Sequence, residues 1–558
     1  MSILLTNSVH WNGRSLAKKL DAAAQEPEAV QQSLLHQLLT RHQTTVFGRE
    51  HGFTQIQTPK DYRSAVPIQD YEGFRPYINC MMQGESNILV NEPVRMFTLT
   101  SGTTGQPKYI PVTPSSERGG SNLMRQWLYR ASLDHPQFLG RASAGIVSPA
   151  VEGYTECGIP YGSVSGRIYQ QIPWIVQRSY AIPYPVFELK DYDSRYLAIA
   201  RFALARQLSF LTTPNPSTLL RLVQVMTTHR ELLIRSIYDG TLGFSVESRL
   251  HSKLQSRLKP QPQRARELET IAETTNALRP KDCWRHLKLL GCWTGGSVGV
   301  QAHRLATEYG SVPVRDLGYM ASEARITLPY QDNTPNGILD LTLNYYEFIS
   351  ENCVDEPNPP ILLSHQLELG KRYSILLTTP GGLYRYHIND IVEVTGFYKK
   401  APLLAFVRKG KDMSNLTGEK LHVNHILMAM EQVQQQFNLA VKQYRLVPNL
   451  DEMRYHLYLE LLEERSDRWI QHTLIPAIDR AIAQVNLEYA QKRDSGRLHS
   501  LCLHLMCPGW AEALQRQAIA GGQPDVQYKW KVFSPEAQPA DYSRILKTFE
   551  SLGTGMDL

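Results

Sequence analysis

The chain has 558 residues and a net charge of +6; 42% of its residues are hydrophobic and 20% are charged. These values are typical of a soluble globular enzyme of two or three domains. No dense run of lysine and arginine accompanies the small positive charge, which disfavours a dedicated nucleic-acid-binding protein.

The first predicted element is helical and runs to about residue 46. Within it Leu34, Leu35, Leu38 and Leu39 recur at helical spacing and form one apolar stripe. Between residues 115 and 285 helical patterns dominate, with proline and glycine at their ends. The pattern then changes to strands, at 287–293, 312–319, 339–349, 373–379, 391–398 and 403–409. Strands mixed with helices on this scale predict α/β layers around one large core.

A smaller α+β unit is predicted after about residue 412. Its expected elements, in order, are a helix (423–437), two strands (439–447 and 453–462), a helix (466–486), a strand (498–506) and a helix (509–518). The polar, glycine-bearing stretch RKGKDMSNLTGEK (408–420) precedes them and is typical of a hinge. We therefore expect a large N-terminal α/β domain, residues 1–410, and a mobile C-terminal cap, residues 411–558.

The cysteines and the first residues of the chain indicate a cytoplasmic protein. Seven scattered cysteines without a C-x-x-C pair favour reduced thiols over a disulfide framework or a zinc site. The opening stretch MSILLTNSVHWNGR has only three consecutive apolar residues, too few for a signal-peptide core. No stretch approaches the length of a membrane span.

The stretch TSGTTGQPK (100–108) is the first that points to chemistry. It does not fit the Walker A pattern, because its glycines are too close together and Lys108 is followed by tyrosine. Glycines let a backbone cup phosphate, and hydroxyls and a lysine add donors. Clusters of serine, threonine and glycine are also common in plain surface turns, so composition alone leaves both interpretations open.

The same string resembles the signature loop of the adenylate-forming superfamily, which covers the β- and γ-phosphates of ATP. The resemblance implies that the loop residues and Lys108 bind ATP, with Lys108 also acting in catalysis; the loop residues are Thr100, Ser101, Gly102, Thr103, Thr104 and Gly105.

Further superfamily motifs follow in the expected order. WTGGSVG (293–299) resembles the loop that lies against adenine and the acyl group, which implies roles for Gly295, Gly296 and Ser297. GYMASEA (318–324) resembles the adenine motif, whose binding residues here are Tyr319, Met320, Ala321 and Ser322. The resemblance implies that Tyr319 stacks on adenine, Ser322 contacts the α-phosphate and Glu323 holds Mg²⁺, an ion that prefers carboxylate and phosphate oxygens. Without the motif, a glutamate such as Glu323 is more often a solvated charge than a metal ligand.

Three more motifs complete the set. YRYHINDIVEVTG (384–396) alternates like a hairpin with Asp390 at its turn, and the resemblance implies that Asp390 accepts hydrogen bonds from both ribose hydroxyls. It also implies that Arg408 contacts ribose and that Lys411 and Asp412 form the hinge. VQYKWKVF (526–533) offers Lys529 and Lys531 as the lysine that reaches the α-phosphate, and the Gln-Tyr-Lys triplet favours Lys529.

Other strings resemble one subfamily across nearly the whole chain, the Gretchen Hagen (auxin-responsive) acyl-acid amido synthetases known from plant hormone conjugation. These strings are VFGREHGF (46–53), DYRSAVPIQDYEGFRPYI (61–78), LNYYEFI (343–349), GLYRYHINDIVEVTGF and the terminal QYK. The chain departs from hormone-conjugating members in its phosphate loop and at Met320-Ala321, which leaves the acid and the acceptor open.

The resemblance implies an ATP- and Mg²⁺-dependent enzyme that adenylates a small carboxylic acid and transfers the acyl group to an amine, with an amino acid as the expected acceptor. The alternatives are an acyl-CoA ligase and a non-catalytic nucleotide- or acyl-binding relative. We expect the acid pocket between the region after residue 115 and the strands near 293–324. The helix at 121–133 either lines this pocket or packs on the core, and Arg125 and Arg130 either pair with a carboxylate or are solvated. A monomer or weak dimer is expected.

Overall fold

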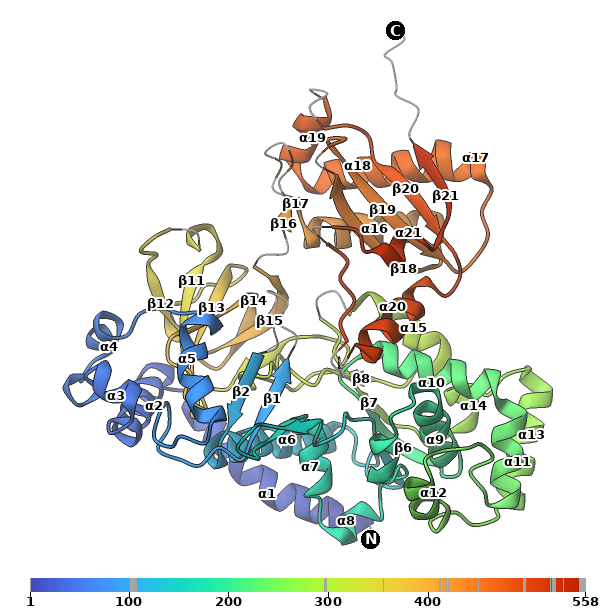
Figure 1. The fold of residues 1–558 in the computed structure, drawn as a ribbon, viewed down its shortest axis with the longest axis horizontal. Coiled ribbons are helices and arrows are strands. Elements are labelled where there is room, and N and C mark those ends of the chain that lie inside the picture. The colour runs from blue at the N-terminus through green and yellow to red at the C-terminus, as the bar shows by residue number, and fades with distance from the viewer. Residues whose placement is uncertain are drawn as a thin grey trace. The chain divides into compact units, whose positions relative to one another are not determined.

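The computed structural model describes residues 2–100, 108–295, 299–354, 356–410, 413–414, 416, 419, 421–449, 451–494, 498–521, 523, 528–534 and 536–550. The chain forms two compact units, residues 1–406 and 407–558, called here the large and the small unit (Figure 1). Within the described ranges no helix is both long enough and apolar enough to cross a membrane.

The large unit begins with helices, as the sequence predicted. They are α1 (Ser2–Ala23), α2 (Pro27–His42), α3 (Val46–Glu50), α4 (Pro59–Ala65) and α5 (Tyr71–Met82). Leu35, Leu38 and Leu39 of α2 are buried, which confirms the apolar stripe. Polar side chains start the short helices: Thr58 caps α4 and Asp70 caps α5, each accepting a bond from a backbone N–H that the helix leaves unpaired.

A small sheet of strand order β2-β1-β5-β4 follows. Its strands are β1 (Met96–Thr100), β2 (Lys108–Val112), β4 (Gly153–Tyr154) and β5 (Pro160–Gly162). β1 and β2 are antiparallel and pair from Met96 opposite Val112 to Thr100 opposite Lys108. Helix α6 (Pro114–Asp134) begins directly after β2, and the Thr113 side chain caps it.

A parallel sheet, β3-β6-β7-β8, forms a second layer, surrounded by helices (Figure 1). Its strands are β3 (Ala142–Gly145), β6 (Leu208–Thr212), β7 (Leu289–Gly291) and β8 (Val314–Arg315). The helices are α7 (Val164–Gln170), α8 (Trp174–Gln177), α9 (Tyr192–Leu204), α10 (Pro216–Thr228), α11 (Arg230–Asp239), α12 (Ser248–Gln255), α13 (Pro262–Thr275), α14 (Pro280–Cys283) and α15 (Gly299–Tyr309). The carboxyl ends of β7 and β8 lead into the motif segments at 293 and 318, where ligands bind in open parallel sheets.

A seven-stranded sheet of order β12-β11-β13-β14-β15-β10-β9 completes the large unit. Its strands are β9 (Thr327–Pro329), β10 (Gly337–Leu339), β11 (Tyr345–Ser350), β12 (Ile361–Leu363), β13 (Arg372–Thr378), β14 (Tyr386–Tyr398) and β15 (Ala401–Lys409), whose end passes into the small unit. The prediction that Asp390 lies at a hairpin turn is wrong, because β14 is one continuous strand. The pairing of β14 with β13 shifts between Ser374 opposite Ile391 and Leu376 opposite His387, so Asp390 lies in a β-bulge.

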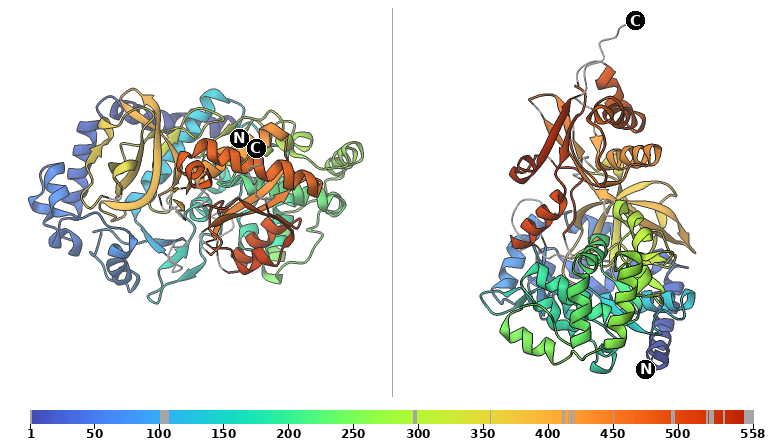
Figure 2. Two further views of the ribbon diagram at one scale, coloured as in Figure 1. Left: turned by 90° about the horizontal axis from the view of Figure 1, so that it is seen from above. Right: turned by 90° about the vertical axis from the view of Figure 1, so that its right-hand side faces the viewer.

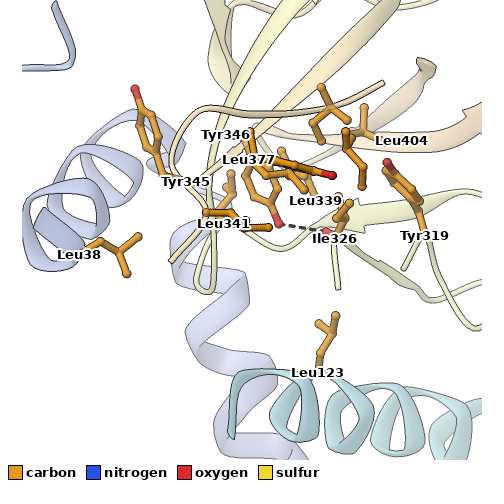
Figure 3. Packing of buried hydrophobic residues seen from close by; sticks show 14 of the residues in the cluster. Leu38, Leu123, Tyr319, Ile326, Leu339, Leu341, Tyr345, Tyr346, Leu377 and Leu404 are labelled. Atoms are coloured by element: carbon orange, nitrogen blue, oxygen red, sulfur yellow. Dashed lines mark hydrogen bonds between the residues drawn. The ribbon is translucent and has the colours of Figure 1, made fainter. Parts of the chain in front are cut away.

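The core of the large unit joins α2 and α6 to this sheet. Leu38 of α2, Leu123 of α6 and Leu377 of β13 belong to one buried cluster (Figure 3). Tyr319 belongs to the same cluster, and the Tyr346 hydroxyl donates to the Ile326 carbonyl at 3.5 Å. The predicted α/β layering of this region is thereby observed.

The small unit is built on the sheet β18-β19-β20-β21. Its strands are β18 (Val441–Asn449), β19 (Arg454–Leu461), β20 (Cys502–Met506) and β21 (Ile545–Glu550), with a two-stranded ribbon of β16 (Met413–Ser414) and β17 (Leu421–His422). Its helices are α16 (Val423–Phe437), α17 (Asp467–Trp469), a π-helical turn (Ile470–Leu474), α18 (Ile475–Val485), α19 (Leu487–Asp494), α20 (Trp510–Ala520) and α21 (Pro539–Tyr542). β19 and β20 are parallel, and α16 and α18 cover the same face of the sheet (Figure 2). The predicted order of elements is present, and β16, β17, α19, α21 and β21 are additions to it.

Candidate active site

The predicted phosphate loop joins β1 to β2. Thr100 ends β1 opposite Lys108, the first residue of β2, and the predicted residues Ser101, Gly102, Thr103, Thr104 and Gly105 lie outside the described residues. The Lys108 ammonium lies 5.4 Å from the centre of the Tyr71 ring, a cation–π arrangement. The Tyr71 hydroxyl in turn accepts from the Tyr109 backbone N–H at 2.7 Å. Tyr71 thus fixes the base of the hairpin and orients the lysine.

Asp316 ties the segment after β7 to the segment after β8. Its carboxylate accepts from the Thr294 backbone N–H at 2.6 Å, from the Thr294 hydroxyl at 2.8 Å and from the Gly318 N–H at 2.7 Å. The Trp293 indole N–H donates to the Gly318 carbonyl at 3.1 Å. The two predicted motif segments are therefore held together, with Gly295 beside Pro335. Gly296 and Ser297 lie outside the described residues.

The burial of the Asp316 carboxyl leads us to expect that the stability of the protein depends on pH. Burial raises the pKa of its carboxyl from 3.8 to about 6, although hydrogen bonds from Thr294 and Gly318 act against this shift. Folding raises the pKa of this carboxyl, so the protonated Asp316 side chain contributes favourably to the free energy of unfolding. This contribution is complete below pH 3.8 and is lost as the pH rises through 6. We expect wild type to gain up to about 3 kcal/mol over Asp316→Asn as the pH falls across this window. Calorimetry of both proteins at matched pH measures the difference, and a constant difference would contradict the prediction.

Tyr319 and Asp390, predicted to bind adenine and ribose, are in contact. The Tyr319 hydroxyl donates to Asp390 Oδ2 at 2.6 Å, and both side chains are buried. Burial raises the pKa of Tyr319, and the nearby Asp390 carboxylate raises it further, so this hydroxyl stays protonated and donates. The Tyr319 ring lies 5.5 Å from Phe406 at a 34° tilt. Gly318 has φ +92°, and a Cβ there would lie 2.3 Å from the Thr327 carbonyl oxygen, so glycine is required before Tyr319.

Ser322 and Glu323 lie in a tight turn that follows Tyr319. An isolated bridge pairs Met320 with Arg325, and the Ala321 N–H donates to the Ala324 carbonyl at 2.8 Å, which closes the turn. The Tyr386 hydroxyl, from the start of β14, donates to Glu323 Oε1 at 3.1 Å. Glu323 is partly exposed, so its carboxylate has room for a further ligand. A partly exposed, oriented carboxylate fits Mg²⁺, which binds proteins through one or two carboxylates plus substrate phosphates.

Arg325 lies at a small cavity between α6 and the segment after β8. The cavity has a volume of about 10 Å³ and is lined by Leu123, Met124, Trp127, Leu317, Met320, Arg325, Thr327 and Leu328. Burial lowers the pKa of the Arg325 guanidinium to about 10. Its Nη1 lies 3.2 Å from the Met320 thioether, and among the described residues no carboxylate lies within ion-pair distance of it. Arg325 is only partly buried, so an anionic ligand can reach this cation, which has no local carboxylate partner among the described residues.

The two arginines that the sequence singled out on α6 have other neighbours. Arg130 pairs with Asp21 at 2.9 Å and lies over the Tyr398 ring at 5.2 Å, so it joins α6 to α1 and β14. Arg125 is exposed, and its Nη1 donates to the Asn122 side chain at 3.4 Å. Leu123 and Trp127 of α6 belong to the buried core cluster and Met124 packs against it, and all three also line the small cavity.

The remaining predicted residues lie in the small unit. Arg408, on β15, donates through Nη1 to the Gly410 carbonyl at 3.1 Å. Lys411 and Asp412, the predicted hinge, lie outside the described residues. Lys529 and Lys531 are exposed on either side of Trp530, which is buried.

Trp530 fixes the position of this lysine segment on β18. Its indole N–H donates to the Tyr444 carbonyl at 2.7 Å, and its ring packs edge-on against Trp510 at 4.8 Å. The Arg445 guanidinium lies 4.6 Å from the Trp530 ring and forms an ion pair with the buried Asp541 at 2.9 Å. The backbone carries Lys529 and Lys531 at defined positions as a result.

Sequence reasoning missed the residues that orient the predicted ones. Asp316 joins the two motif segments, Tyr386 donates a hydrogen bond to Glu323, and Tyr71 lies beside Lys108. Asp316 is the one acidic residue of the predicted strand 312–319, a signal that was present in the sequence. Tyr71 had no such signal, because only the fold brings α5 beside β2.

Comparisons with known proteins match nearly the whole chain. Three family models match in chain order: the GH3 family N-terminal domain over residues 16–314, the GH3 family central domain over 337–409 and the GH3 family C-terminal domain over 424–538. An indole-3-acetic acid-amido synthetase, GH3.2 of Arabidopsis thaliana, is 23% identical over 446 residues, which are 75% of this chain and 81% of the relative. The jasmonoyl–L-amino acid synthetase JAR6 of Nicotiana attenuata is 21% identical over 528 residues, 90% of each chain.

Solved structures share the fold. The GH3.15 acyl acid amido synthetase superposes with a TM-score of 0.85 over 97% of both chains at 18% identity. A 2-hydroxyisobutyryl-CoA ligase in the postadenylation state superposes with a TM-score of 0.51 over 91% of this chain and 89% of its own, at 13% identity. These likenesses confirm the predicted fold class of adenylate-forming enzymes.

Proposed function

Because the chain belongs to the GH3 family, we propose that it is an ATP-dependent acyl acid amido synthetase that joins a small carboxylic acid to an amine. The observation that carries the proposal is a connected set of side chains after β7 and β8 and at the start and the bulge of β14. There Tyr319 donates a hydrogen bond to Asp390, and Tyr386 donates one to Glu323. Asp316 joins the segment after β7 to the segment after β8, which carries Tyr319 and Glu323.

The reaction has two steps. In the first, a carboxylate oxygen of the acid attacks the α-phosphorus of ATP, and pyrophosphate leaves with the electrons of the broken P–O bond. In the second, an amine attacks the carbonyl of the acyl-adenylate, AMP leaves, and the amine loses a proton to form the amide. The acid itself is the nucleophile, so the protein contributes positioning and charge rather than a covalent intermediate.

The residues divide between the two ends of the nucleotide. Tyr319 and Asp390 bind the nucleoside, and Arg408 adds a ribose contact. Lys108 and the loop at 100–105 face the β- and γ-phosphates, and Ser322 the α-phosphate. Glu323 would hold Mg²⁺, which neutralises phosphate oxygens when bound. Lys529 neutralises the α-phosphate during the first step, and a rotation of the small unit about Lys411 and Asp412 then admits the amine.

The acid and the acceptor are proposed from the relatives and from the cavity. The named relatives act on indole-3-acetic acid and conjugate jasmonate to amino acids, which supports a small apolar acid and an amino acid acceptor. Leu123, Met124 and Trp127 of α6 give the cavity wall an apolar face, and Arg325 gives it a positive charge. The cavity, at about 10 Å³, has room for no more than about one water molecule, so we place the acid beside it rather than inside it, with Arg325 facing an anionic group of the substrates.

Arg325→Met tests this placement. Loss of a charged partner from an ion pair to a carboxylate or phosphate oxygen costs about 2–5 kcal/mol, so we expect kcat/KM for the acid to fall by roughly 30- to 5,000-fold. The fold should be retained, because methionine has a similar length and needs no polar partner. Arg130→Met is the matched control, since Arg130 already pairs with Asp21. Equal effects of the two substitutions on kcat/KM, with unchanged stability, would remove Arg325 from the acid site.

One observation favours a second candidate, an acyl-CoA ligase. The loop TSGTTGQPK keeps the general superfamily pattern rather than that of hormone-conjugating members. The fold shared with a CoA ligase at a TM-score of 0.51 is compatible with this candidate. The family models, which span the chain from residue 16 to 538, favour the amido synthetase.

Mass spectrometry decides between the two. The purified full chain is incubated with ATP, Mg²⁺ and a panel of carboxylic acids, once with an amino-acid mixture and once with coenzyme A. An amide together with AMP is the expected result, and it identifies both substrates. A thioester would establish the CoA ligase. Absence of pyrophosphate release with every acid would favour a nucleotide- or acyl-binding relative without catalysis.

A further inference from the structure

A second group of reactive side chains lies in the small unit, on the face of its sheet that carries Tyr458. His456 of β19 is paired in register with Cys502 of β20, and His504 follows two residues later. Successive side chains of a strand point to opposite faces, so all three lie on one face. The possible ligand atoms of His456, Cys502 and His504 lie within 4.8 Å of one another.

The distances resemble those of a metal site. His456 Nδ1 lies 2.8 Å from His504 Nε2, and Cys502 Sγ lies 3.9 Å from the same nitrogen. Tetrahedral zinc bonded to two imidazoles separates their nitrogens by roughly 3.3 Å, so a shift of about 0.5 Å suffices. Cys502 and His504 are buried and His456 is partly exposed, which leaves an approach for an ion from solvent.

Both histidines have a partner on the ring nitrogen that faces away from the cluster. His456 Nε2 lies 3.2 Å from Glu452 Oε2, which also lies 3.3 Å from the Arg454 guanidinium. His504 Nδ1 lies 2.8 Å from the Thr548 hydroxyl of β21. Metal-bound histidines almost always donate their second N–H to such an oxygen, which fixes the tautomer and the orientation of the ring.

We propose that His456, Cys502 and His504 form a binding site for Zn²⁺ on the sheet of the small unit. His456 binds through Nδ1, His504 through Nε2 and Cys502 as a thiolate, whose proton passes to solvent. Two imidazoles and one thiolate are ligands that Zn²⁺ favours, and the fourth position is left to water. The bound ion would connect β19 to β20, and through Thr548 to β21.

The sequence alone favours reduced thiols over a zinc site, because the seven cysteines are scattered and form no C-x-x-C pair. The ligands come from strands that are 46 residues apart at their paired positions, His456 and Cys502. Only the parallel pairing of β19 with β20, which requires the long helical connection between them, brings the three side chains together.

Zinc titration of the full chain, freed of metal with a chelator, tests the proposal. We expect one equivalent of Zn²⁺ to bind, and Cys502→Ser to weaken binding at least about tenfold. Co²⁺ is the spectroscopic probe: a thiolate-to-metal absorption band is expected in wild type and should be absent from Cys502→Ser. Cys507→Ser is the matched control, because Cys507 is in the same unit and outside the cluster. The Cys507→Ser variant should retain both the wild-type affinity for Zn²⁺ and the absorption band of the Co²⁺ form.

Thr548→Val keeps the test independent of folding defects, since valine matches threonine in shape and Thr548 is exposed. We expect it to lower the Zn²⁺ affinity about 10- to 100-fold by releasing the His504 ring. Failure to bind Zn²⁺, or equal affinity in wild type and Cys502→Ser, would overturn the proposal.

Discussion

Replacement of Lys529 by alanine should lower the rate of acyl-adenylate formation by about 10²- to 10³-fold. This is the usual effect of removing one preorganised donor from a developing negative charge. The ammonium would face the α-phosphate, whose oxygens gain charge as the carboxylate attacks. Exchange of labelled pyrophosphate into ATP, in the presence of the acid, measures this step without the amine.

Lys531→Ala is the matched control for this prediction. Lys529 and Lys531 are both exposed and flank the buried Trp530, so either substitution removes one charge from the same fixed segment. We expect Lys531→Ala to keep most of the exchange activity. The opposite ranking would assign the adenylation role to Lys531, the alternative that the sequence left open.

The second half-reaction separates a role in adenylation from a general defect. Preformed acyl-adenylate supplied with the amine should react in Lys529→Ala at nearly the wild-type rate, because Lys529 has left the α-phosphate by then in the proposed cycle. Equal losses of rate in both half-reactions would contradict the assignment of Lys529 to the first step.

The order of elements in the chain was predictable where the pattern is long and periodic. The helix over Val423–Phe437 and the strands around Val441–Asn449 and Arg454–Leu461 are found as expected. Leu208–Thr212 was missed, because a short apolar run inside a helical region has no periodicity that distinguishes a buried strand from a helix. Asp390 was assigned to a turn, since Asn389-Asp390 has turn chemistry that a β-bulge shares.

The candidate site was predictable as a set of strings but not as a set of contacts. Tyr319 and Asp390 are 71 residues apart, and their hydrogen bond exists because the segment after β8 runs beside the bulge of β14. Glu323 and Tyr386 meet for the same reason, 63 residues apart. The residues that bind a ligand are named by local motifs, whereas the residues that orient them are determined by which strands become neighbours.

Glu323→Gln should lower acyl-adenylate formation by about 10²- to 10³-fold at ordinary Mg²⁺ concentrations. Glutamine keeps the shape of the side chain and can still accept the Tyr386 hydrogen bond, so the turn between Met320 and Arg325 should be retained. It removes the negative charge that Mg²⁺ requires of its protein ligand. The rate of pyrophosphate release as a function of Mg²⁺ concentration measures the effect, and excess Mg²⁺ should restore little of it.

Tyr386→Phe is the informative comparison, because it leaves the Glu323 carboxylate in place and removes only its donor. A hydrogen bond to a charged group contributes about 1.5–3 kcal/mol, so the expected loss is roughly 10- to 150-fold. Raising the Mg²⁺ concentration should recover much of this loss, since the carboxylate remains and only its orientation is freed. ATP binding measured without Mg²⁺ should be unchanged in both variants, because Tyr319 and Asp390 remain intact. If Glu323→Gln kept wild-type activity and the same Mg²⁺ dependence, the metal would have to be held by the substrate phosphates alone, and Glu323 would be a charge on a surface turn.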